Sequence, residues 1–419
     1  MMGYNYRTSV NRVNIINHTA HKDKKERNQP LPSSVISNIA VSESVANTQL
    51  KIATFNLFNY LEPPNAFYEF ERIYSAEQWA KKQKWVAEYL REFQPDIIGF
   101  QEVFSADSLK ELVASQGYAY FEVVDQPDVI DDFIYRSPVV AIASRYPIAE
   151  VAAVEANTEL AQTLGLANDF SFSRKVIRAT VELPHMGNCD CYVVHFKSKR
   201  PMIEIDEKNN SWSPEKTIIE SLKANVAGGW GSTIQRGSEA TLLMIDMIER
   251  REVTGNPMVL MGDFNNTLAD GVLSHLLTNT LRFVSRIDCD AYLAKYCLND
   301  AWDLFQTAVT NDKNEADKES KVDSEEATDI ADKTDTSNIS TISKREEKVM
   351  RTPTHYFGAG SSVLDYILLS CEFDASYHDS LYQVSAYDTY DRHLINPIFE
   401  RDGESTDHGI VLVTLTLRS

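Results

Sequence analysis

The sequence predicts a mixed-sheet α/β or α+β sandwich, and two observations carry that prediction. Amphipathic helical patterns alternate with strand patterns along the chain, and the strands outnumber the helices that could cross between them. Neighbouring parallel strands need a long crossover connection, usually a helix, so the surplus of strands favours mixed sheets. Hydrophobic residues make up 43% of the 419 residues, which is enough apolar material for a substantial core.

The first strand–helix–strand unit begins at Lys51. The segment "KIATFNLFNY" predicts a strand with a polar end. Ser75 with Gln78 three residues later forms a capping-box pattern, which predicts the start of a helix. Gln94-Pro95 ends this helix, and "DIIGFQEV" follows as the second strand. Apolar residues repeat at helical spacing between these limits, at Trp79, Val86, Tyr89, Leu90 and Phe93.

A second unit follows the same order later in the chain. "SEATLLMIDMIERR" predicts an amphipathic helix over about 237–250, opened by Arg236. "TGNP" closes this helix, and "MVLMGDFN" is the next strand. Further strands are expected at "SPVVAIASRYPI", "RKVIRATVELP", "CDCYVVHFKS", "VLDYILLS" and "DHGIVLVTLTLR".

Two stretches outside these elements contain few large apolar residues. Residues 1–49 are polar, and we expect a flexible N-terminal tail there. Residues 311–350 have an acidic, low-complexity composition that predicts a disordered insertion. Because the segments that carry the candidate site lie on both sides of this insertion, we expect one domain over 50–419.

The chain is acidic, with 61 Asp and Glu against 41 Lys and Arg and a formal net charge of −20. This charge argues against unaided binding of nucleic acid or an anionic membrane, although a divalent metal could supply local positive charge. No apolar run approaches the ~20 residues that span a bilayer, and the N-terminus lacks the apolar core of a secretory signal. We therefore expect a cytoplasmic protein with no transmembrane segment and no obligate protein partner.

Polar side chains stand at the ends or starts of six predicted strands. In layered α/β folds, ligand groups gather where strands leave the core. A single polar residue at such a place is often a turn cap, so the set carries the prediction of a shared site. Its members are Asn56, Gln101-Glu102, His195 with Lys197 and Lys199, Asp263 with Asn265, Asp365, and Asp407-His408.

These residue types suit metal-assisted phosphoester hydrolysis. Carboxylates with an amide are ligands that Mg²⁺ or Mn²⁺ prefers, and two histidines suit acid/base work near neutral pH. Lys197 and Lys199, two and four residues after His195, are apt for holding a phosphate. Arg174 and Arg178 could also reach phosphate, while pairing with a surface carboxylate is an equally good explanation.

With these motifs in view, the chain resembles the endonuclease/exonuclease/phosphatase superfamily, which includes pancreatic DNase, apurinic endonucleases, sphingomyelinases and inositol phosphatases. The resemblance runs from about Lys51 to the C-terminus, less the acidic insertion, and "HFKSK" is similar to a bacterial nuclease-like branch. It implies a DNase I-like, four-layer sandwich of two mixed sheets with helices outside. The motifs stand in family order: "TFNLFN", "GFQEV", "VVHFKS", "GDFN", "LDYILLS" and "STDHG".

The resemblance also implies metal ligands and a water-handling residue. Glu102 matches the principal metal-binding glutamate, and Asn56 matches the asparagine beside it. Asp407 matches an aspartate assigned to the metal or its hydration shell. Asp263 matches the aspartate that aligns or activates the attacking water, and Asn265 the asparagine that steadies the phosphoryl oxygens.

Two histidines receive roles in the same way. His408 matches the histidine that contacts the phosphate and takes part in acid/base chemistry. Asp365 matches the carboxylate that orients it, so we expect a hydrogen bond between Asp365 and His408. His195 stands where DNase-like and sphingomyelinase-like members carry their other histidine, a candidate acid for the leaving oxygen.

The leading functional prediction is a Mg²⁺- or Mn²⁺-dependent phosphodiester hydrolase, a nuclease that cleaves DNA or RNA by in-line attack of water. Two alternatives stay open: a phosphatase or phospholipase-type enzyme acting on an inositol phosphate or sphingomyelin, and a catalytically silent binding protein on the same fold. A nuclease should show a positive groove beside the site. A membrane-lipid hydrolase should expose an apolar or aromatic loop there.

Overall fold

Two six-stranded β-sheets form the framework of the computed structural model, which describes residues 48–203, 205, 212–277, 292–310 and 350–418. All of these residues belong to one unit, Ala46–Ser419. The tail and the insertion expected from the sequence lie outside the described residues, except for their last residues. Their predicted disorder therefore stays a prediction.

The first sheet is mixed, because its central strand pairs in parallel on one side and antiparallel on the other. This central strand is β1, which is parallel to β3 and antiparallel to β17. In spatial order the strands are β16 (Tyr382–Tyr390), β17 (Ile410–Leu417), β1 (Gln49–Tyr60), β3 (Ile97–Val103), β7 (Val139–Ser144) and β4 (Tyr120–Glu122).

The second sheet is mixed as well, with one parallel pair, β10 and β11, among antiparallel neighbours. Its spatial order is β12 (Asn299–Asp300), β15 (Asp365–Leu369), β11 (Met258–Asp263), β10 (Gly187–His195), β9 (Val176–Leu183) and β8 (Ile148–Val154). The strand predicted at "SPVVAIASRYPI" is confirmed as β7, but it ends at Ser144, and the last predicted residue, Ile148, begins β8 of the second sheet. Pro147 lies between them, and proline interrupts a strand ladder.

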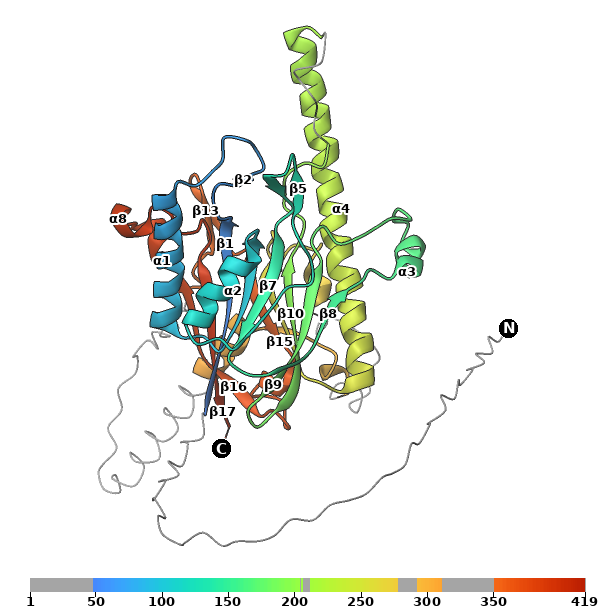
Figure 1. Ribbon diagram of the computed structural model, residues 1–419. Helices are drawn as coiled ribbons and strands as arrows, with labels where there is room; N and C mark the ends of the chain where they lie inside the picture. The colour runs from blue at the N-terminus through green and yellow to red at the C-terminus, as the bar shows by residue number, and fades with distance from the viewer. Residues whose placement is uncertain (1–47, 204, 206–211, 278–291, 311–349, 419) are drawn as a thin grey trace, which may run out of the picture. The chain divides into compact units, whose positions relative to one another are not determined.

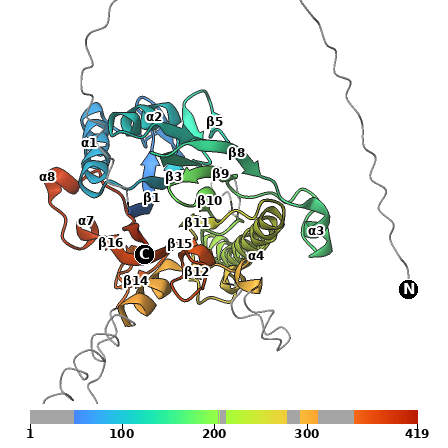
Figure 2. The same cartoon turned by 90° about the horizontal axis from the view of Figure 1, so that it is seen from below.

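The two sheets pack face to face and share one apolar core. Ile52 and Ile142 of the first sheet belong to the same buried cluster as Val193 and Met261 of the second. At Gly99 the sheets approach so closely that a Cβ atom would lie 3.0 Å from Met261 and Val193 side-chain atoms. Helices cover the two outer faces, as Figures 1 and 2 show, so the predicted four-layer arrangement is confirmed.

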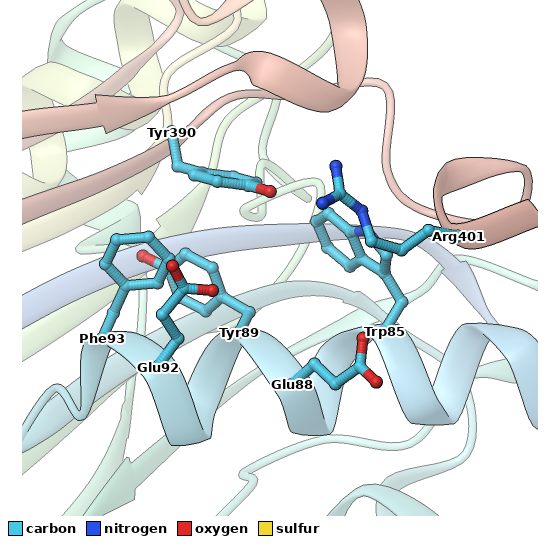
Figure 3. A pocket seen from close by; sticks show the side chains of 7 residues that line it. All are labelled: Trp85, Glu88, Tyr89, Glu92, Phe93, Tyr390 and Arg401. Carbon is cyan, nitrogen blue, oxygen red and sulfur yellow. The ribbon is translucent and has the colours of Figure 1, made fainter. Parts of the chain in front are cut away.

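Helices α1 (Ala76–Phe93) and α2 (Ala106–Ser115) cover the first sheet. The predicted capping box at Ser75 and Gln78 is present, and Gln94 ends α1 in a left-handed conformation. Figure 3 shows Trp85, Tyr89 and Phe93 of α1 pointing toward Tyr390 at the end of β16. Their ring centroids lie 6.2, 5.7 and 5.3 Å from that of Tyr390, so α1 is fixed to the sheet by aromatic packing.

The second sheet is covered by one long helix, α4 (Pro214–Thr254). The predicted start of this helix at Arg236 is wrong, because α4 begins at Pro214 and Arg236 lies in its interior. Ser213 caps the N-terminus with Pro214 in the first turn, the local signal that favours a helix start at this point. Only the second half of α4 packs on the sheet, through Ala240, Leu243, Met244 and Met247.

The first half of α4 runs past the ends of the strands, as Figure 1 shows at the top of the molecule. It exposes six large apolar side chains, which we call the apolar arc: Ile218, Ile219, Leu222, Val226, Trp230 and Ile234. Among the described residues, no helix is long and apolar enough to cross a membrane.

Smaller elements complete the described part of the chain. A three-stranded sheet and a β-hairpin lie outside the two large sheets. Their strands are β2 (Ala66–Phe67), β6 (Ile134–Arg136) and β5 (Asp128–Ile130), and β13 (His355–Phe357) and β14 (Gly360–Ser362). The short helices are α3 (Thr158–Thr163), α7 (Arg392–Ile395) and α8 (Phe399–Asp402), with 3₁₀ turns at Ser274–Leu276 and Cys371–Phe373.

Candidate active site

Three adjacent strands of the second sheet place polar residues side by side. His195 of β10 pairs in register with Asp263 of β11, and Asp263 pairs with Asp365 of β15. Directly opposed residues on neighbouring strands have Cβ atoms only about 5 Å apart. The ladder therefore brings together three of the residues that the sequence analysis selected.

Asp263 is the centre of this row, and its side chain is 2% exposed. Its Oδ2 accepts from Asn56 Nδ2 at 3.3 Å, across the gap between the two sheets, and lies 3.4 Å from His195 Nε2. The backbone N–H of Asn265 donates to Oδ1 at 2.7 Å, and Asn265 Nδ2 donates to Oδ2 at 3.2 Å. Burial raises the pKa of Asp263 to about 7, although the charge of His408 opposes this shift.

Gly262 allows this row to form. Its φ is +148°, and a Cβ atom built there would lie 2.0 Å from the carbonyl oxygen of Val194 on β10. No side chain fits in that space, so the "GDFN" motif needs glycine before the aspartate.

His408 lies between two carboxylates. Its Nδ1 is 2.8 Å from Asp365 Oδ2, which confirms the predicted pair, and its Nε2 is 4.0 Å from Asp263 Oδ2. Burial opposes the charged imidazolium, but Asp365 and Asp263 together raise the pKa of His408 well above its usual value. His195 behaves oppositely: burial lowers its pKa well below the usual range, and Arg174 and His408 add to that effect.

Glu102 and Asp407 face the row from the first sheet's side. Glu102 lies one residue before the end of β3 with φ +59°, and its Oε2 accepts from the backbone N–H of Asn59 at 2.9 Å. Burial raises the pKa of Glu102, and the negative charge of Asp407 raises it further. Phe58, Asn59 and Asn265 also have positive φ values, and such strained backbone gathers at functional sites.

The donor set beside Glu102 fits a hard divalent cation. Asp407 Oδ1 and Asn59 Oδ1 are buried and have no hydrogen-bond partner within the described part of the chain. Two facing carboxylates and unpartnered oxygen atoms are what Mg²⁺ or Mn²⁺ satisfies. In the described ranges, two groups bring metal-ligand atoms within 4.8 Å of one another: His355, Asp407 and His408, and Asp263, Asp365 and His408. The Asp365–His408 hydrogen bond already occupies the second group, so the first group, which contains Asp407, is the better fit for a metal.

Most predicted site residues line one pocket of about 620 Å³. Asn56 and Asp365 lie behind it, each bonded to a lining residue. The predicted residues among its lining are Glu102, His195, Lys199, Asp263, Asn265, Asp407 and His408.

Two predicted substrate-binding residues do not line this pocket. Lys197 Nζ turns back to donate to the carbonyl of Arg200 at 3.3 Å, while the Lys197 backbone N–H donates to Glu239 at 2.7 Å. Arg178 pairs with Glu150 at 2.5 Å on the exposed part of the second sheet. The structure therefore supports the surface-pair explanation of Arg178.

Basic side chains at the pocket are more numerous than the sequence analysis anticipated. Arg72, Arg174 and Arg200 line it together with Lys199. The Arg200 guanidinium lies 5.9 Å over the ring of Tyr68, another lining residue. Four basic side chains therefore line the pocket beside the carboxylates of Glu102, Asp263 and Asp407, in a chain whose net charge is −20.

Lys82, a buried lysine below the site, was also not among the predicted site residues. Lys82 of α1 is 1% exposed, and its Nζ donates to the carbonyl of Ser405 at 3.0 Å. The ammonium group also lies 5.8 Å from the ring of Phe58 and 5.5 Å from that of Tyr74. Burial lowers the pKa of Lys82 to about 8, and Asp407 opposes this shift. The available signal was a lysine within the apolar stripe of the predicted helix.

The chain was compared with known proteins. Solved structures resemble the chain at low identity, with TM-scores below 0.5. The human Nocturnin catalytic domain with bound sulfate is 14% identical over 88% of this chain and 95% of that one, with a TM-score of 0.49. TDP2 of D. rerio complexed with a single-strand DNA product is 10% identical over 88% and 100%, at 0.44. An endonuclease/exonuclease/phosphatase of Beutenbergia cavernae DSM 12333 is 15% identical over 88% and 72%, at 0.45.

A comparison with curated proteins found no match. The family model described as Endonuclease/Exonuclease/phosphatase family matches residues 53–378, which is most of the chain and includes every strand of the row. The chain therefore belongs to the endonuclease/exonuclease/phosphatase family, whose members are phosphoesterase hydrolases.

Proposed function

We propose that the protein is a Mg²⁺- or Mn²⁺-dependent phosphodiester hydrolase that cleaves nucleic acid. The observation that carries this proposal is the convergence of His195 and His408 on one buried carboxylate, Asp263, at 3.4 and 4.0 Å. The facing acids Glu102 and Asp407 line the same pocket. Acid/base groups opposite a hard-cation site suit hydrolysis of a phosphate ester.

In the proposed reaction Asp263 acts on the attacking water and His408 acts on the phosphate. The raised pKa of Asp263, about 7, matches a group that orients a water molecule and accepts its proton near neutral pH. His408 stays positively charged because Asp365 holds its other ring nitrogen, and this charge stabilises the phosphoryl oxygens. Asn265 Nδ2 donates to Asp263 and to the Phe196 carbonyl, so it fixes the position of the carboxylate.

His195 is neutral in the substrate-free site, since burial and nearby cations lower its pKa. A bound phosphate diester places negative charge beside it, which raises the pKa and favours the protonated ring. His195 then becomes able to donate a proton to the leaving oxygen. Glu102, Asp407 and Asn59 would hold the metal, which supplies Lewis-acid stabilisation of charge on the phosphate.

The lining of the pocket favours a nucleic acid among phosphodiesters. Arg72, Arg174, Lys199 and Arg200 provide positive charge for a sugar–phosphate backbone. Tyr68 and other aromatic side chains line the same pocket, and aromatic faces beside basic groups suit stacking on single-stranded bases. This combination supports a nucleic acid over the other phosphodiesters as the substrate.

A second candidate is a phospholipase-type enzyme. The apolar arc of α4 begins beside the pocket, because Ser232 of α4 donates to the carbonyl of Arg200, a lining residue. An exposed apolar element next to the site is the criterion for a membrane-lipid hydrolase. Because of the arc, a lipid phosphodiester is the alternative substrate.

The test is a hydrolysis panel with the full-length chain, in Mg²⁺, in Mn²⁺ and in EDTA. The substrates are single- and double-stranded DNA, RNA, inositol phosphates and sphingomyelin vesicles. We expect cleavage of nucleic acid that EDTA abolishes, and cleavage of sphingomyelin instead would select the second candidate. Failure to cleave any phosphoester with either metal would refute the hydrolase.

Two substitutions in the site accompany this panel. Glu102→Gln should lower kcat/KM at least about a thousandfold without unfolding the protein, because it deletes a charged metal ligand. His408→Ala should do the same by deleting the cation that faces the phosphate. Glu111→Gln, on the exposed face of α2, is the matched control and should keep full activity. Normal turnover by either site variant would overturn the assignment.

A further inference from the structure

Three polar side chains form a buried stripe along one face of α4. We call Ser232, Arg236 and Glu239 the polar stripe, and they are 0%, 3% and 1% exposed. Their spacing of four and three residues places them on the same face of the helix. Charged side chains are rarely buried to this extent unless they are paired or hydrogen-bonded, so the partners of the stripe indicate its role.

The polar stripe binds the backbone of the short segment that follows β10. The backbone N–H of Lys197 donates to Glu239 Oε2 at 2.7 Å, and Arg236 Nη1 donates to the Lys197 carbonyl at 2.9 Å. Ser232 Oγ donates to the carbonyl of Arg200, which also accepts from Lys197 Nζ at 3.3 Å. The stripe therefore holds both ends of this segment.

Glu239 also holds a second segment, which precedes β9. The backbone N–H of Ser173 donates to Glu239 Oε1 at 2.7 Å. Gln235, one turn earlier on α4, donates to the same oxygen at 3.1 Å and to the carbonyl of Ser171 at 2.8 Å. Arg174 follows Ser173 directly. One buried carboxylate thus joins the segment before β9 to the segment after β10.

These two segments carry three of the four basic side chains that line the pocket. Arg174 belongs to the first segment, and Lys199 and Arg200 belong to the second. No described residue of α4 lines the pocket itself. Hydrogen bonds from N–H groups to a carboxylate are roughly twice as strong as those between neutral groups, so Glu239 restrains both segments firmly.

We propose that Glu239 is a positioning residue, which sets the relative placement of Arg174, Lys199 and Arg200 and thereby the affinity of the pocket for phosphate. The inference rests on the proposed phosphodiester hydrolysis and adds the element that controls substrate binding. It also gives Lys197 a role in substrate binding through its backbone and its bond to Arg200.

Glu239→Gln in the full-length chain tests this proposal. A glutamine side chain accepts at only one of its two terminal atoms, so the N–H of either Ser173 or Lys197 loses its acceptor. We expect the dissociation constant for inorganic phosphate, measured by isothermal titration calorimetry in EDTA, to rise about tenfold. The KM for the phosphodiester that the wild type cleaves should rise by a similar factor.

A purely structural role of Glu239 leads to a different result. A destabilised variant contains fewer folded molecules, which lowers the apparent kcat but leaves KM and the phosphate dissociation constant unchanged. Glu249→Gln, on the exposed face of α4, is the matched control and should keep wild-type values. Gln235→Ala is a milder change at a half-buried position, and it should raise the phosphate dissociation constant about threefold. This second variant decides the question if Glu239→Gln does not fold.

Two results would overturn the proposal. They are an unchanged phosphate dissociation constant in both variants, and a wild type that binds no phosphate. The calorimetric measurement involves no turnover, so it separates this proposal from the proposed function. Failure of the wild type to cleave any phosphoester would refute the hydrolase, while the effect of Glu239 on phosphate binding would still be measured.

Discussion

Helix α1 and the first half of α4 treat apolar and charged side chains in opposite ways. Helix α1 buries an aromatic stripe against the first sheet and buries one lysine, Lys82, within that stripe. The first half of α4 exposes an apolar arc and packs on the chain through glycine and serine. Each helix thus departs from the usual burial of apolar side chains and exposure of charged ones, and both departures lie near the candidate site.

These two exceptions to the burial rule differ in their position relative to the strand ends. The lysine of α1 lies below the loop that carries Asp407 and His408, where it supplies charge and a hydrogen bond. The arc of α4 lies beyond the strand ends, where no part of the described chain covers it. Lys82 is therefore suited to hold the site, whereas the arc leaves an apolar surface exposed beside it.

Two tryptophans give the largest expected contrast. Trp85 of α1 is 4% exposed, packs against Phe55 and donates to Asp402 at 3.0 Å, so Trp85→Ala leaves a cavity and removes one of the donors to the Asp402 carboxylate. We expect a loss of about 3–5 kcal/mol in the free energy of unfolding, measured by urea denaturation. Trp230→Ala on α4, where the side chain is 66% exposed, should change it by less than about 0.5 kcal/mol. Equal losses would show that the arc is covered by the chain itself.

Substitution of Lys82 should have the next largest effect, a loss of activity. Lys82→Met keeps the length and apolar stem of the side chain but removes the donor to Ser405 and the charge near Asp407. We expect kcat/KM to fall about a hundredfold, the usual scale for a small misplacement of reacting groups. Steady-state kinetics should show the loss mainly in kcat.

Two further substitutions control this result. Lys84→Met, on the same helix with a 75% exposed side chain, should keep full activity. Lys82→Arg should recover part of the rate, because it restores the positive charge, which a purely packing role would not explain. Wild-type kinetics for Lys82→Met would refute a positioning role.

Two neighbouring glycines of α4 give the smallest effects, with opposite signs. At Gly229 a Cβ atom would meet nothing within 4 Å, so Gly229→Ala should stabilise the protein by about 0.5–1 kcal/mol through helix propensity. At Gly228 the Cβ atom would strike the backbone of Ile203, and Gly228→Ala should destabilise by about 1–3 kcal/mol. Urea denaturation of both variants measures the difference. A stabilising Gly228→Ala would contradict the packing of segment 200–203 on α4.

The layers and the row of site residues could be predicted from the sequence because both depend on local patterns. Strand ends are visible where an apolar run meets polar residues, and parallel neighbours bring such ends together. The Asp365–His408 pair and the capping box of α1 were predicted and are present. Asn59 was not predicted. Its backbone N–H donates to Glu102 of β3, and only the pairing of β1 with β3 brings the two residues together.

The positions of Arg174 and Arg178 could not be predicted from local sequence patterns. Strand β9 runs antiparallel to β10, so it begins near His195 and moves away by about 3.3 Å per residue. Arg174, just before the strand, therefore lines the pocket, while Arg178 inside the strand pairs with Glu150. Distinguishing the two requires the direction of β9, which is a property of the sheet. The outward orientation of the apolar arc is likewise set by segment 200–203, a tertiary contact.

The in-register row of His195, Asp263 and Asp365 has a consequence for how this architecture can diversify. Neighbouring strands keep a separation of about 4.8 Å whatever side chains they carry, so the spacing of these three residues is a property of the backbone. Loops and helices at the rim, α4 among them, can lengthen or change sequence without altering that spacing. Under the proposed function, the strand ends would carry the chemistry and the rim of the pocket would carry the choice of substrate.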